Sequence, residues 1–403
     1  MRRRDVLLGL GGLSAAPIFQ RTQHSVDAAP QLPTPTFHFN EPIKCVAGIR
    51  PYRRHSFRLE RERVPSQPSK FLVHNYGHGG AGISLSWGVA TKVRDMVKSH
   101  IATVADRDAA VLGSGVIGMT AARLLVELGL RVTIYAREPW DETTSYVAGG
   151  QWAPSTVDCE DVQLAKDVIR TSYKRFASAI GSTYGVSKVP NYTKTPQVDL
   201  DKVIDLFPPG GTDELIPARQ PVGLLPFGRD MGPGFVYQTL LIEPPIFLKQ
   251  LRTELEANQV AFRRAVFSTP GDVFALRENI IVNCTGFGAR ALWNDNEVVP
   301  VKGQLAMLPA QLDLKYLFSR NGQMFPRSDA VVIGGTMEPC TENKTANPTV
   351  CRGLVDDIKG VFGMAPMVER FAFHIDHPSK MDEVAPLIGG GTPLFERCRR
   401  VQT

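Results

Sequence analysis

The chain has 403 residues and a formal net charge of +6, and 43% of its residues are hydrophobic while 21% are charged. This composition is typical of a globular protein, and at this length two domains are the default expectation. The basic residues are scattered among acidic ones and form no long block, so the sequence does not indicate nucleic-acid binding.

Six cysteines are spread along the chain, without a C-x-x-C pair and without a His/Cys cluster at zinc-ligand spacing. No metal site is therefore expected. Cys340 and Cys351 flank a polar loop and could pair in an oxidising compartment, but unpaired thiols are the favoured interpretation.

The N-terminus reads MRRRDVLLGLGGLSAAPIF, in which arginines precede an apolar run too short to span a bilayer. The stretch from Arg3 to Leu7 resembles a twin-arginine signal. This pattern predicts an export signal over residues 1–29 and a periplasmic or extracellular protein. The alternative is a basic terminus on a cytoplasmic protein.

The next segments alternate between strand and helix patterns. IKCVAGIRPYRRHSFRLERE predicts two strands joined by a turn, and SKFLVHNYGHGGAGISLSWG begins an apolar strand, a glycine-rich turn and a helix to about His100. After a linker at 101–108, AAVLGSGVIGMTAARLLVELGLRVTIYARE predicts a βαβ unit. Further helices are expected at 162–179, after Thr239 and beyond Val350, with a strand-rich region at 299–336.

The βαβ unit carries the pattern of a dinucleotide site. Gly113 allows a tight turn, Gly115 lets backbone amides approach a diphosphate, and Gly118 lets the helix pack against the strand. Glu138 lies twenty residues after Gly118, at the end of the second strand, where its carboxylate can accept hydrogen bonds from ribose.

A second polar loop, TTSYVAGGQWAPS, follows the βαβ unit. It offers the hydroxyl groups of Thr143, Thr144 and Ser145, and then Gly149 and Gly150 for close backbone approach. A nicotinamide enzyme has no general need of such a loop, whereas a flavin with its ribityl chain does. The loop therefore favours FAD.

Four blocks resemble the D-amino-acid oxidase family: VLGSGVIGMTAA; TTSYVAGGQWAP; IIVNCTGFGARAL with VKGQLAML; and IRPYRRHSFRLERE with VHNYGHGGAGISLSWG. The resemblance implies an α/β fold, in which a Rossmann-like FAD-binding domain is intertwined with an antiparallel-sheet α+β substrate domain. The last block ends the chain in the usual family order but comes first here, so the sequence resembles a circular permutant.

The implied domain boundaries follow from this order. Residues 48–157 and 244–299 form the FAD-binding domain, residues 158–243 and 300–364 the substrate-binding domain, and residues 365–403 an unassigned tail. The predicted cofactor-binding residues are Gly113, Gly115, Val116, Ile117, Gly118, Arg137, Glu138, Thr143, Thr144, Ser145, Gly150, Gln151, Trp152, Val266, Cys284, Gly286, Arg61, Gly79, Gly82, Ile83 and Ser84.

Three residues take substrate roles by resemblance. Arg53 is expected to bind the substrate carboxylate, the Gly80 carbonyl to accept from the amine, and Gln323 to stand near the place of a family tyrosine. Arg61 is expected beside the flavin ring, and His78 as a hydrogen-bonding group behind the site. The family has two tyrosines before its G-G-T turn, whereas this chain has none there, so the substrate side departs from the family.

The resemblance implies an oxidase that moves a hydride from the α-carbon of a D-amino acid to flavin N5, giving a 2-oxo acid, ammonia and hydrogen peroxide. Its partners would be an amino acid or amine substrate and molecular oxygen; homodimer formation is left open. Two alternatives remain: a flavin amine oxidase or dehydrogenase acting on a modified or cyclic amine, and a non-catalytic flavin-binding protein.

Overall fold

A computed structural model describes residues 31–37, 43–194, 203, 205–208, 214–227, 231–320 and 322–364. The predicted export signal at 1–29 and the tail at 365–403 lie outside these ranges, so export stays a prediction. None of the helices in the described part combines the length and apolar character that a membrane span requires.

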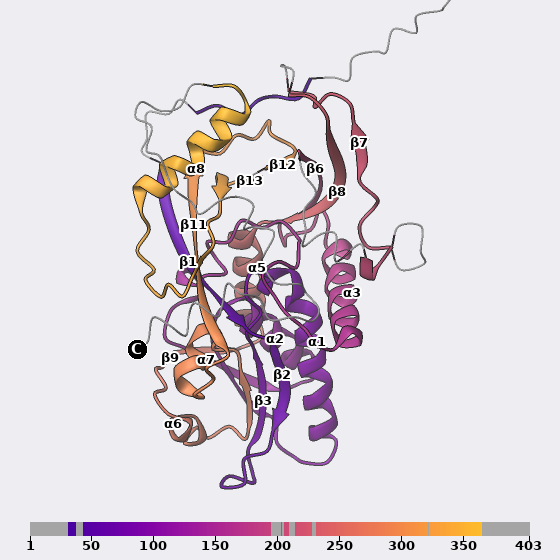
Figure 1. Cartoon of the computed structure of the whole chain (residues 1–403). Coiled ribbons are helices and arrows are strands. Elements are labelled where there is room, and N and C mark those ends of the chain that lie inside the picture. Colours follow the sequence, from indigo (N-terminus) through magenta and orange to yellow (C-terminus); the bar gives the residue numbers. More distant parts are fainter. Residues whose placement is uncertain are drawn as a thin grey trace, which may run out of the picture.

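A six-stranded sheet forms one half of the protein, in the order β2-β3-β10-β4-β5-β9 (Figure 1). All strands except β2 run parallel. The bounds are β2 (Arg58–Glu62), β3 (Phe71–Tyr76), β4 (Asp108–Leu112), β5 (Arg131–Ala136), β9 (Ala261–Arg264) and β10 (Ile280–Asn283). β4, the helix α2 and β5 are the predicted βαβ unit.

Helices cover both faces of this sheet, which explains why its central strands read as continuous apolar runs. Side chains alternate along β4: Ala109 and Val111 face one hydrophobic cluster, and Ala110 and Leu112 face another. On the first face lie α1 (Gly82–Ile101), α2 (Val116–Glu127), α3 (Val162–Ser178) and α5 (Pro244–Ala257); on the second lie α6 (Pro270–Phe274) and α7 (Ala289–Leu292).

A nine-stranded sheet forms the other half, in the order β1-β11-β14-β13-β12-β6-β8-β7, with β15 paired to β11. Its strands are β1 (Lys44–Arg53), β6 (Val186–Thr193), β7 (Gln220–Val222), β8 (Gly234–Ile242), β11 (Val298–Leu308), β12 (Leu317–Arg320), β13 (Gly322–Pro326), β14 (Val331–Gly334) and β15 (Glu338–Pro339). Its pairs are antiparallel except β12 with β6.

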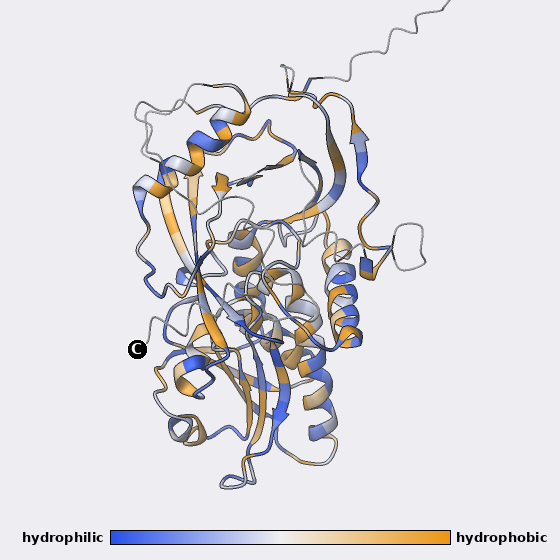
Figure 2. Cartoon of the chain, viewed as in Figure 1, coloured by the Kyte–Doolittle hydropathy of each residue, from blue (hydrophilic) through white to orange (hydrophobic). Residues whose placement is uncertain are grey.

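The outer face of this larger sheet packs against α8 (Pro348–Val361). Orange and blue segments alternate along α8 in Figure 2, and its apolar side chains Leu354, Val355 and Ile358 belong to the cluster on this face. The inner face turns toward the Rossmann-like half. Short 3₁₀ turns, η1 (Trp140–Glu142) and η2 (Gly286–Gly288), follow β5 and β10. The fold is the expected one: a Rossmann-like α/β half intertwined with an antiparallel α+β half.

Two details differ from the sequence expectations. Strand β1, most of which falls inside the predicted FAD-binding segment 48–157, pairs along its whole length with β11 in the larger sheet. Cys340 is disulfide-bonded, whereas Cys351 is a buried free cysteine, so the two do not pair and the expectation of unpaired thiols is wrong for Cys340. The pairing of β1 with β11 depends on a contact between distant parts of the chain.

The permuted order stays a prediction, but the topology is compatible with it. β3 and β4 follow one another through α1 and lie on either side of β10. Ile43 and Met364, near the two ends of the described chain, pack against the same hydrophobic cluster under α8. A short connection between these two ends is therefore compatible with the packing.

A rethreaded chain tests the permutation. Residues 108–364 would be followed by a flexible linker of about ten residues, which spans roughly 16–19 Å, and then by residues 43–107. We expect a cooperative thermal unfolding transition and the same circular dichroism spectrum as the same residues in their present order, because the core contacts are unchanged. A chain that does not fold would contradict the prediction.

Candidate flavin and substrate site

The turn between β4 and α2 is built from glycines that no other residue can replace. Gly113 has φ +109°, and a Cβ there would lie 2.4 Å from the Cys284 carbonyl oxygen. A Cβ on Gly118 would lie 2.0 Å from the Gly113 carbonyl oxygen, so the helix packs directly on the turn. These distances give the glycines the tasks that the sequence predicts.

The N-termini of α1 and α2 meet above this turn. The ideal Cβ position of Gly82 lies 3.7 Å from Cγ1 of Val116. Neither N-cap residue, Ala81 or Gly115, provides a side-chain cap, and neither first turn contains an acidic residue. Two positive helix ends without side-chain caps from their N-cap residues therefore converge on one place, which suits a diphosphate.

A buried amide lies at the carboxyl end of β3, beside these helix ends in the fold. Asn75 is 0% exposed, and neither polar atom of its side chain has a hydrogen-bond partner among the described residues. Buried amides are normally satisfied. Together with the glycine turn, this amide fits a site made to receive a polar cofactor.

A cavity of about 650 Å³ lies at the end of β5. Ser114, Arg137 and Glu138 line it on one side, and Phe262 and Arg264 on another. The Glu138 carboxylate pairs with Lys344 at 2.7 Å and with Arg137 at 3.2 Å. Burial raises the pKa of Glu138, but these cations lower it further, so the net shift is downward and the group is an ionised acceptor for ribose hydroxyls.

The second polar loop joins the two halves of the protein. The Val116 amide at the start of α2 donates to Ser145 Oγ at 3.1 Å, and the Ile49 amide of β1 donates to Thr144 Oγ1 at 3.3 Å. Gly150 has φ +109°, and its ideal Cβ position is 2.3 Å from the Ile242 carbonyl oxygen. The loop is therefore held between α2, β1 and β8.

Trp152 anchors the end of this loop. Its ring is fully buried, and Nε1 donates to the Ser84 carbonyl at 3.2 Å. The Ala153 amide donates to Ser84 Oγ at 3.1 Å. Trp152 thus contributes by fixing the loop to the first turn of α1, and Thr143 closes a local turn by donating to the Trp140 carbonyl at 2.8 Å.

The turn from His78 to Gly82 passes over the same place. Gly79 has φ +53°, and a Cβ there would lie 1.7 Å from the Thr156 carbonyl oxygen. Gly80 lies against the aliphatic part of Arg50, since its ideal Cβ position is 3.4 Å from Arg50 Cδ. The His78 ring is buried and stacks on Phe57, and its Nε2 has no described partner. The structure therefore does not show the hydrogen-bonding role expected for His78.

Arg53 does not reach this place. Its Nε pairs with Asp295 at 2.9 Å, and Nη1 donates to the Ser56 carbonyl at 2.8 Å. Arg50 lies three residues earlier on β1, and alternate residues of a strand face opposite sides. The arginine that turns toward the glycine turns is Arg50, so the structure does not support the assignment of Arg53 as the carboxylate-binding residue.

The Arg50 guanidinium lies among glycines. Its nitrogens are 2.4 and 2.5 Å from the ideal Cβ position of Gly303 and 3.3 Å from that of Gly335. Nη1 donates to the Thr336 carbonyl at 2.9 Å, and no carboxylate in the described part of the chain forms an ion pair with it. Arg50 is not among the residues predicted from the sequence, although its odd spacing from Arg53 on one strand requires the two side chains to face apart.

Two other predicted residues also lie elsewhere. Arg61 is on β2, with its guanidinium 4.7 Å from the centre of the Phe71 ring. After burial, its positive charge is the next cause that lowers the pKa of His100, near the C-terminal end of α1. A helix of 20 residues is about 30 Å long, so Arg61 is far from the first turn of α1 and not beside a flavin ring there. Val266 is 65% exposed and does not line the cavity at the end of β5.

The remaining predicted cofactor residues gather at the carboxyl ends of β3, β10 and β4. Cys284 follows β10 directly and Gly286, with φ +56°, begins η2. Ile83 and Ser84 form the first turn of α1, and Ile117 that of α2. Gln151 bridges to Leu241 of β8.

Gln323 is half-buried on β13, opposite Ser319 of β12. Its neighbour Met324 faces the α8 side, whereas the Phe325 ring contacts Gly149, whose ideal Cβ position is 2.5 Å from it. Gln323 and Phe325 are two residues apart and share the inner face. The structure therefore turns Gln323 toward the second polar loop.

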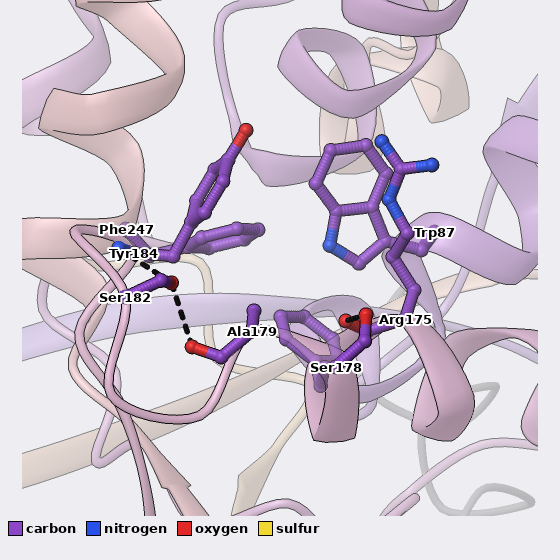
Figure 3. Close-up of a pocket in the computed structure, with 8 residues that line it drawn as sticks. Trp87, Arg175, Ser178, Ala179, Ser182, Tyr184 and Phe247 are labelled. Atoms are coloured by element: carbon purple, nitrogen blue, oxygen red, sulfur yellow. Dashed lines mark hydrogen bonds between the residues drawn. The ribbon is translucent and has the colours of Figure 1, made fainter.

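Another hollow lies outside this site. Figure 3 shows Trp87, Tyr184 and Phe247 around it, with Arg175 beside the indole. Its volume is about 210 Å³, and it contains none of the predicted cofactor or substrate residues. Arg175 stacks on Trp87 at 4.5 Å from the ring centre.

Comparisons with known proteins agree with this geometry. Residues 108–398 match a protein family described as FAD dependent oxidoreductase (DAO). The chain belongs to this FAD-dependent oxidoreductase family. It is 31% identical over 260 residues to a D-amino-acid oxidase of Streptomyces coelicolor, covering 62% of this chain and 76% of that protein. It is 26% identical over 272 residues to human D-aspartate oxidase, with the same coverage.

Among solved structures, glycine oxidase from Geobacillus kaustophilus is 16% identical and gives a TM-score of 0.48, with 63% of this chain and 77% of that chain covered. The family match over residues 108–398 makes the protein an FAD-dependent oxidoreductase. The glycine turn, the converging helix ends and Glu138 fit the diphosphate and ribose of FAD.

Substitution of Gly118 tests the cofactor site. Gly118→Ala places a methyl group 2.0 Å from the Gly113 carbonyl oxygen, so the turn has to shift. Overpacking of this kind costs about 1–3 kcal/mol. We expect the FAD dissociation constant, measured by flavin fluorescence, to rise at least about tenfold, since 1.4 kcal/mol is a factor of ten. Gly360→Ala on α8 meets nothing within 4 Å and is the matched control; equal FAD affinity of all three proteins would contradict the assignment.

Two buried histidines predict loss of stability in acid. Burial lowers the pKa of His78 to about 3, and burial together with Arg58 lowers that of His74 to about 4 although Glu62 raises it. Both folded-state pKa values lie below the ordinary histidine value of 6.5, so the unfolded chain binds more protons below that pH. Stability is therefore lost as the pH falls from about 6.5 toward 4, by up to about 1.4 kcal/mol per pH unit for each histidine.

Urea unfolding between pH 7 and pH 4 measures this loss. His78→Asn should reduce the slope of unfolding free energy against pH by roughly 1.4 kcal/mol per unit. His55→Gln is the control for the substitution itself, because that side chain is 56% exposed. An unchanged slope in His78→Asn would show that this histidine is not held neutral.

Proposed function

We propose that the protein is an FAD-dependent D-amino-acid oxidase, which converts its substrate to a 2-oxo acid, ammonia and hydrogen peroxide. Bound FAD would supply the redox chemistry, as acceptor of a hydride from the substrate α-carbon and donor of electrons to molecular oxygen. The names of the curated relatives, D-amino-acid oxidase and D-aspartate oxidase, support this choice. The contribution of the chain itself is to hold and orient the substrate.

The observation that carries the proposal is the environment of Arg50. Burial lowers its pKa to about 10, although Glu338 raises it, so the guanidinium stays protonated at neutral pH. A partly buried cation without a described carboxylate partner is costly unless it receives an anion. Its planar fork suits the two oxygens of a carboxylate. The guanidinium itself occupies the space over Gly303 and borders Gly335, so the absence of side chains at these two positions is what lets Arg50 lie here.

Gly80 is placed to meet the substrate amine. It lies beside the aliphatic part of Arg50, so an amino acid that binds through its carboxylate has its amine close to this turn. A backbone carbonyl accepts a hydrogen bond from an amine and orients it. His78 is held neutral by burial, with a pKa of about 3, which supports catalysis by positioning without a proton carrier at this residue.

A second candidate is an amine oxidase or dehydrogenase that acts on a modified or cyclic amine. It is favoured by the side chains at 323–325, where Gln323 and Phe325 face the site and no tyrosine is present. A non-catalytic flavin-binding protein is disfavoured, because Arg50 would then be a partly buried cation with no substrate carboxylate to offset the cost of its burial.

Anaerobic bleaching of the yellow holoenzyme separates these candidates. D- and L-amino acids, glycine, cyclic imino acids and secondary amines would each be added, and the flavin absorbance followed. We expect bleaching by D-amino acids, and hydrogen peroxide after oxygen is readmitted. Bleaching by amines alone would favour the second candidate. If dithionite bleaches the flavin and no substrate does, the oxidase proposal fails.

Substitution of the two β1 arginines tests which one binds substrate. Arg50→Leu should keep the flavin absorbance but lower kcat/KM by about 10- to 100-fold, mainly through KM, because a charge-assisted hydrogen bond is worth about 1.5–3 kcal/mol. Arg53→Leu should instead lower the melting temperature, since it leaves Asp295, 8% exposed, without its cation. The reverse pattern would restore Arg53 as the carboxylate-binding residue.

A further inference from the structure

The inner face of the larger sheet carries five uncharged polar side chains, here called the neutral polar cluster: Gln151, Asn191, Tyr237, Ser319 and Gln323. Asn191, Tyr237 and Ser319 are at most 3% exposed and belong to β6, β8 and β12. Gln151 comes from the second polar loop, and Gln323 from β13. None of the five side chains is ionised at neutral pH.

Hydrogen bonds hold four members of the cluster together. Asn191 Nδ2 donates to the Tyr237 hydroxyl at 2.6 Å, and the Ser319 hydroxyl donates to Asn191 Oδ1 at 3.2 Å. Gln151 Nε2 donates to the same Tyr237 hydroxyl at 3.1 Å. The loop that serves the cofactor and three strands of the substrate half are therefore joined by one buried network.

Two polar groups of the cluster are left over. Gln151 Oε1 is buried and has no hydrogen-bond partner among the described residues. The Gln323 amide, on the same face as Ser319, has no described partner either. Buried polar groups of native proteins are normally satisfied, so the unmet Gln151 acceptor, in a cluster that also contains the half-buried Gln323 amide, indicates a ligand that both donates and accepts.

The cluster lies next to Arg50 across the sheet. Met324 of β13 pairs with Ile333 of β14, so the register brings Gln323 beside Gly334. The next residue, Gly335, lies 3.3 Å from the Arg50 guanidinium, measured from its ideal Cβ position. Neighbouring strands are about 4.8 Å apart. The side chain of a substrate bound by its carboxylate to Arg50 therefore reaches the neutral polar cluster when it is three or four atoms long.

We infer that this cluster selects the substrate side chain, and that the preferred substrates are D-amino acids whose side chains end in a carboxamide, such as D-glutamine and D-asparagine. This inference rests on the proposed oxidase function. An apolar side chain would leave Gln151 Oε1 unsatisfied, which a site built for hydrogen bonds penalises strongly. A carboxylate side chain would be buried without a cation, because the cluster contains none.

Kinetics with matched substrates test the inference. The FAD-loaded enzyme should turn over D-glutamine with kcat/KM about 10- to 100-fold above that of D-methionine, which has nearly the same shape, and of D-glutamate. Gln151→Leu and Gln323→Leu should each shift the D-glutamine to D-methionine ratio by about tenfold toward D-methionine. Gln163→Leu, on the exposed side of α3, is the matched control and should leave the ratio unchanged.

Binding of carboxylates that cannot react gives a second readout. Glutaramate should raise the melting temperature of the holoenzyme more than hexanoate or glutarate does, and Gln151→Leu should remove the difference. D-amino acids turned over without a carboxamide preference, together with equal thermal shifts, would overturn the inference alone. If no D-amino acid bleaches the flavin in the wild-type protein, the oxidase function itself fails, whichever carboxylate binds.

Discussion

The meeting of the α1 and α2 N-termini is the constraint on which the rest of the site depends. Gly113 bends the chain in a left-handed conformation, and Gly118 lets α2 pack directly on this turn, which places Val116 at the start of α2 beside Gly82 of α1. The result is a pair of positive helix ends with free amides, which a diphosphate can satisfy. Because Trp152 is anchored to Ser84 in the first turn of α1, the second polar loop is positioned by the same contact.

The second polar loop connects the N-terminus of α1 to the larger sheet. Its Gly150 lies against β8, and Arg327, after β13, donates to the Ala148 carbonyl at 2.8 Å. The flavin side and the substrate side are therefore not independent surfaces that happen to face each other. A shift of α1 would move the loop, and through it Gln151 and the hydrogen bond to Tyr237.

Local patterns predicted the parts of this structure that local forces build. The βαβ unit, its glycine turn and the position of Glu138 depend on residues within about thirty positions of one another, and they lie as expected. Arg61 and Val266 were misplaced because each lies on or next to an edge strand of the six-stranded sheet, β2 or β9. Local sequence patterns do not show which strands form the edges of a sheet. The pairing of β1 with β11 also joins distant segments. Strand alternation could have separated Arg50 from Arg53, but not which of them faces the cofactor.

The absence of tyrosines at 323–325 does not leave the inner face without a phenol. Tyr237 supplies one from β8, where it is bonded to Asn191 and Gln151 and therefore fixed before any ligand arrives. A network whose members satisfy one another adds little cost to the folded protein. Gln151 has both roles, because its Nε2 donates to Tyr237 while its Oε1 is left without a partner among the described residues. Stability and selectivity thus rest on different atoms of the same side chain, and Gln323, which is bonded to no other member, offers the substitution that changes substrate choice with the network left intact.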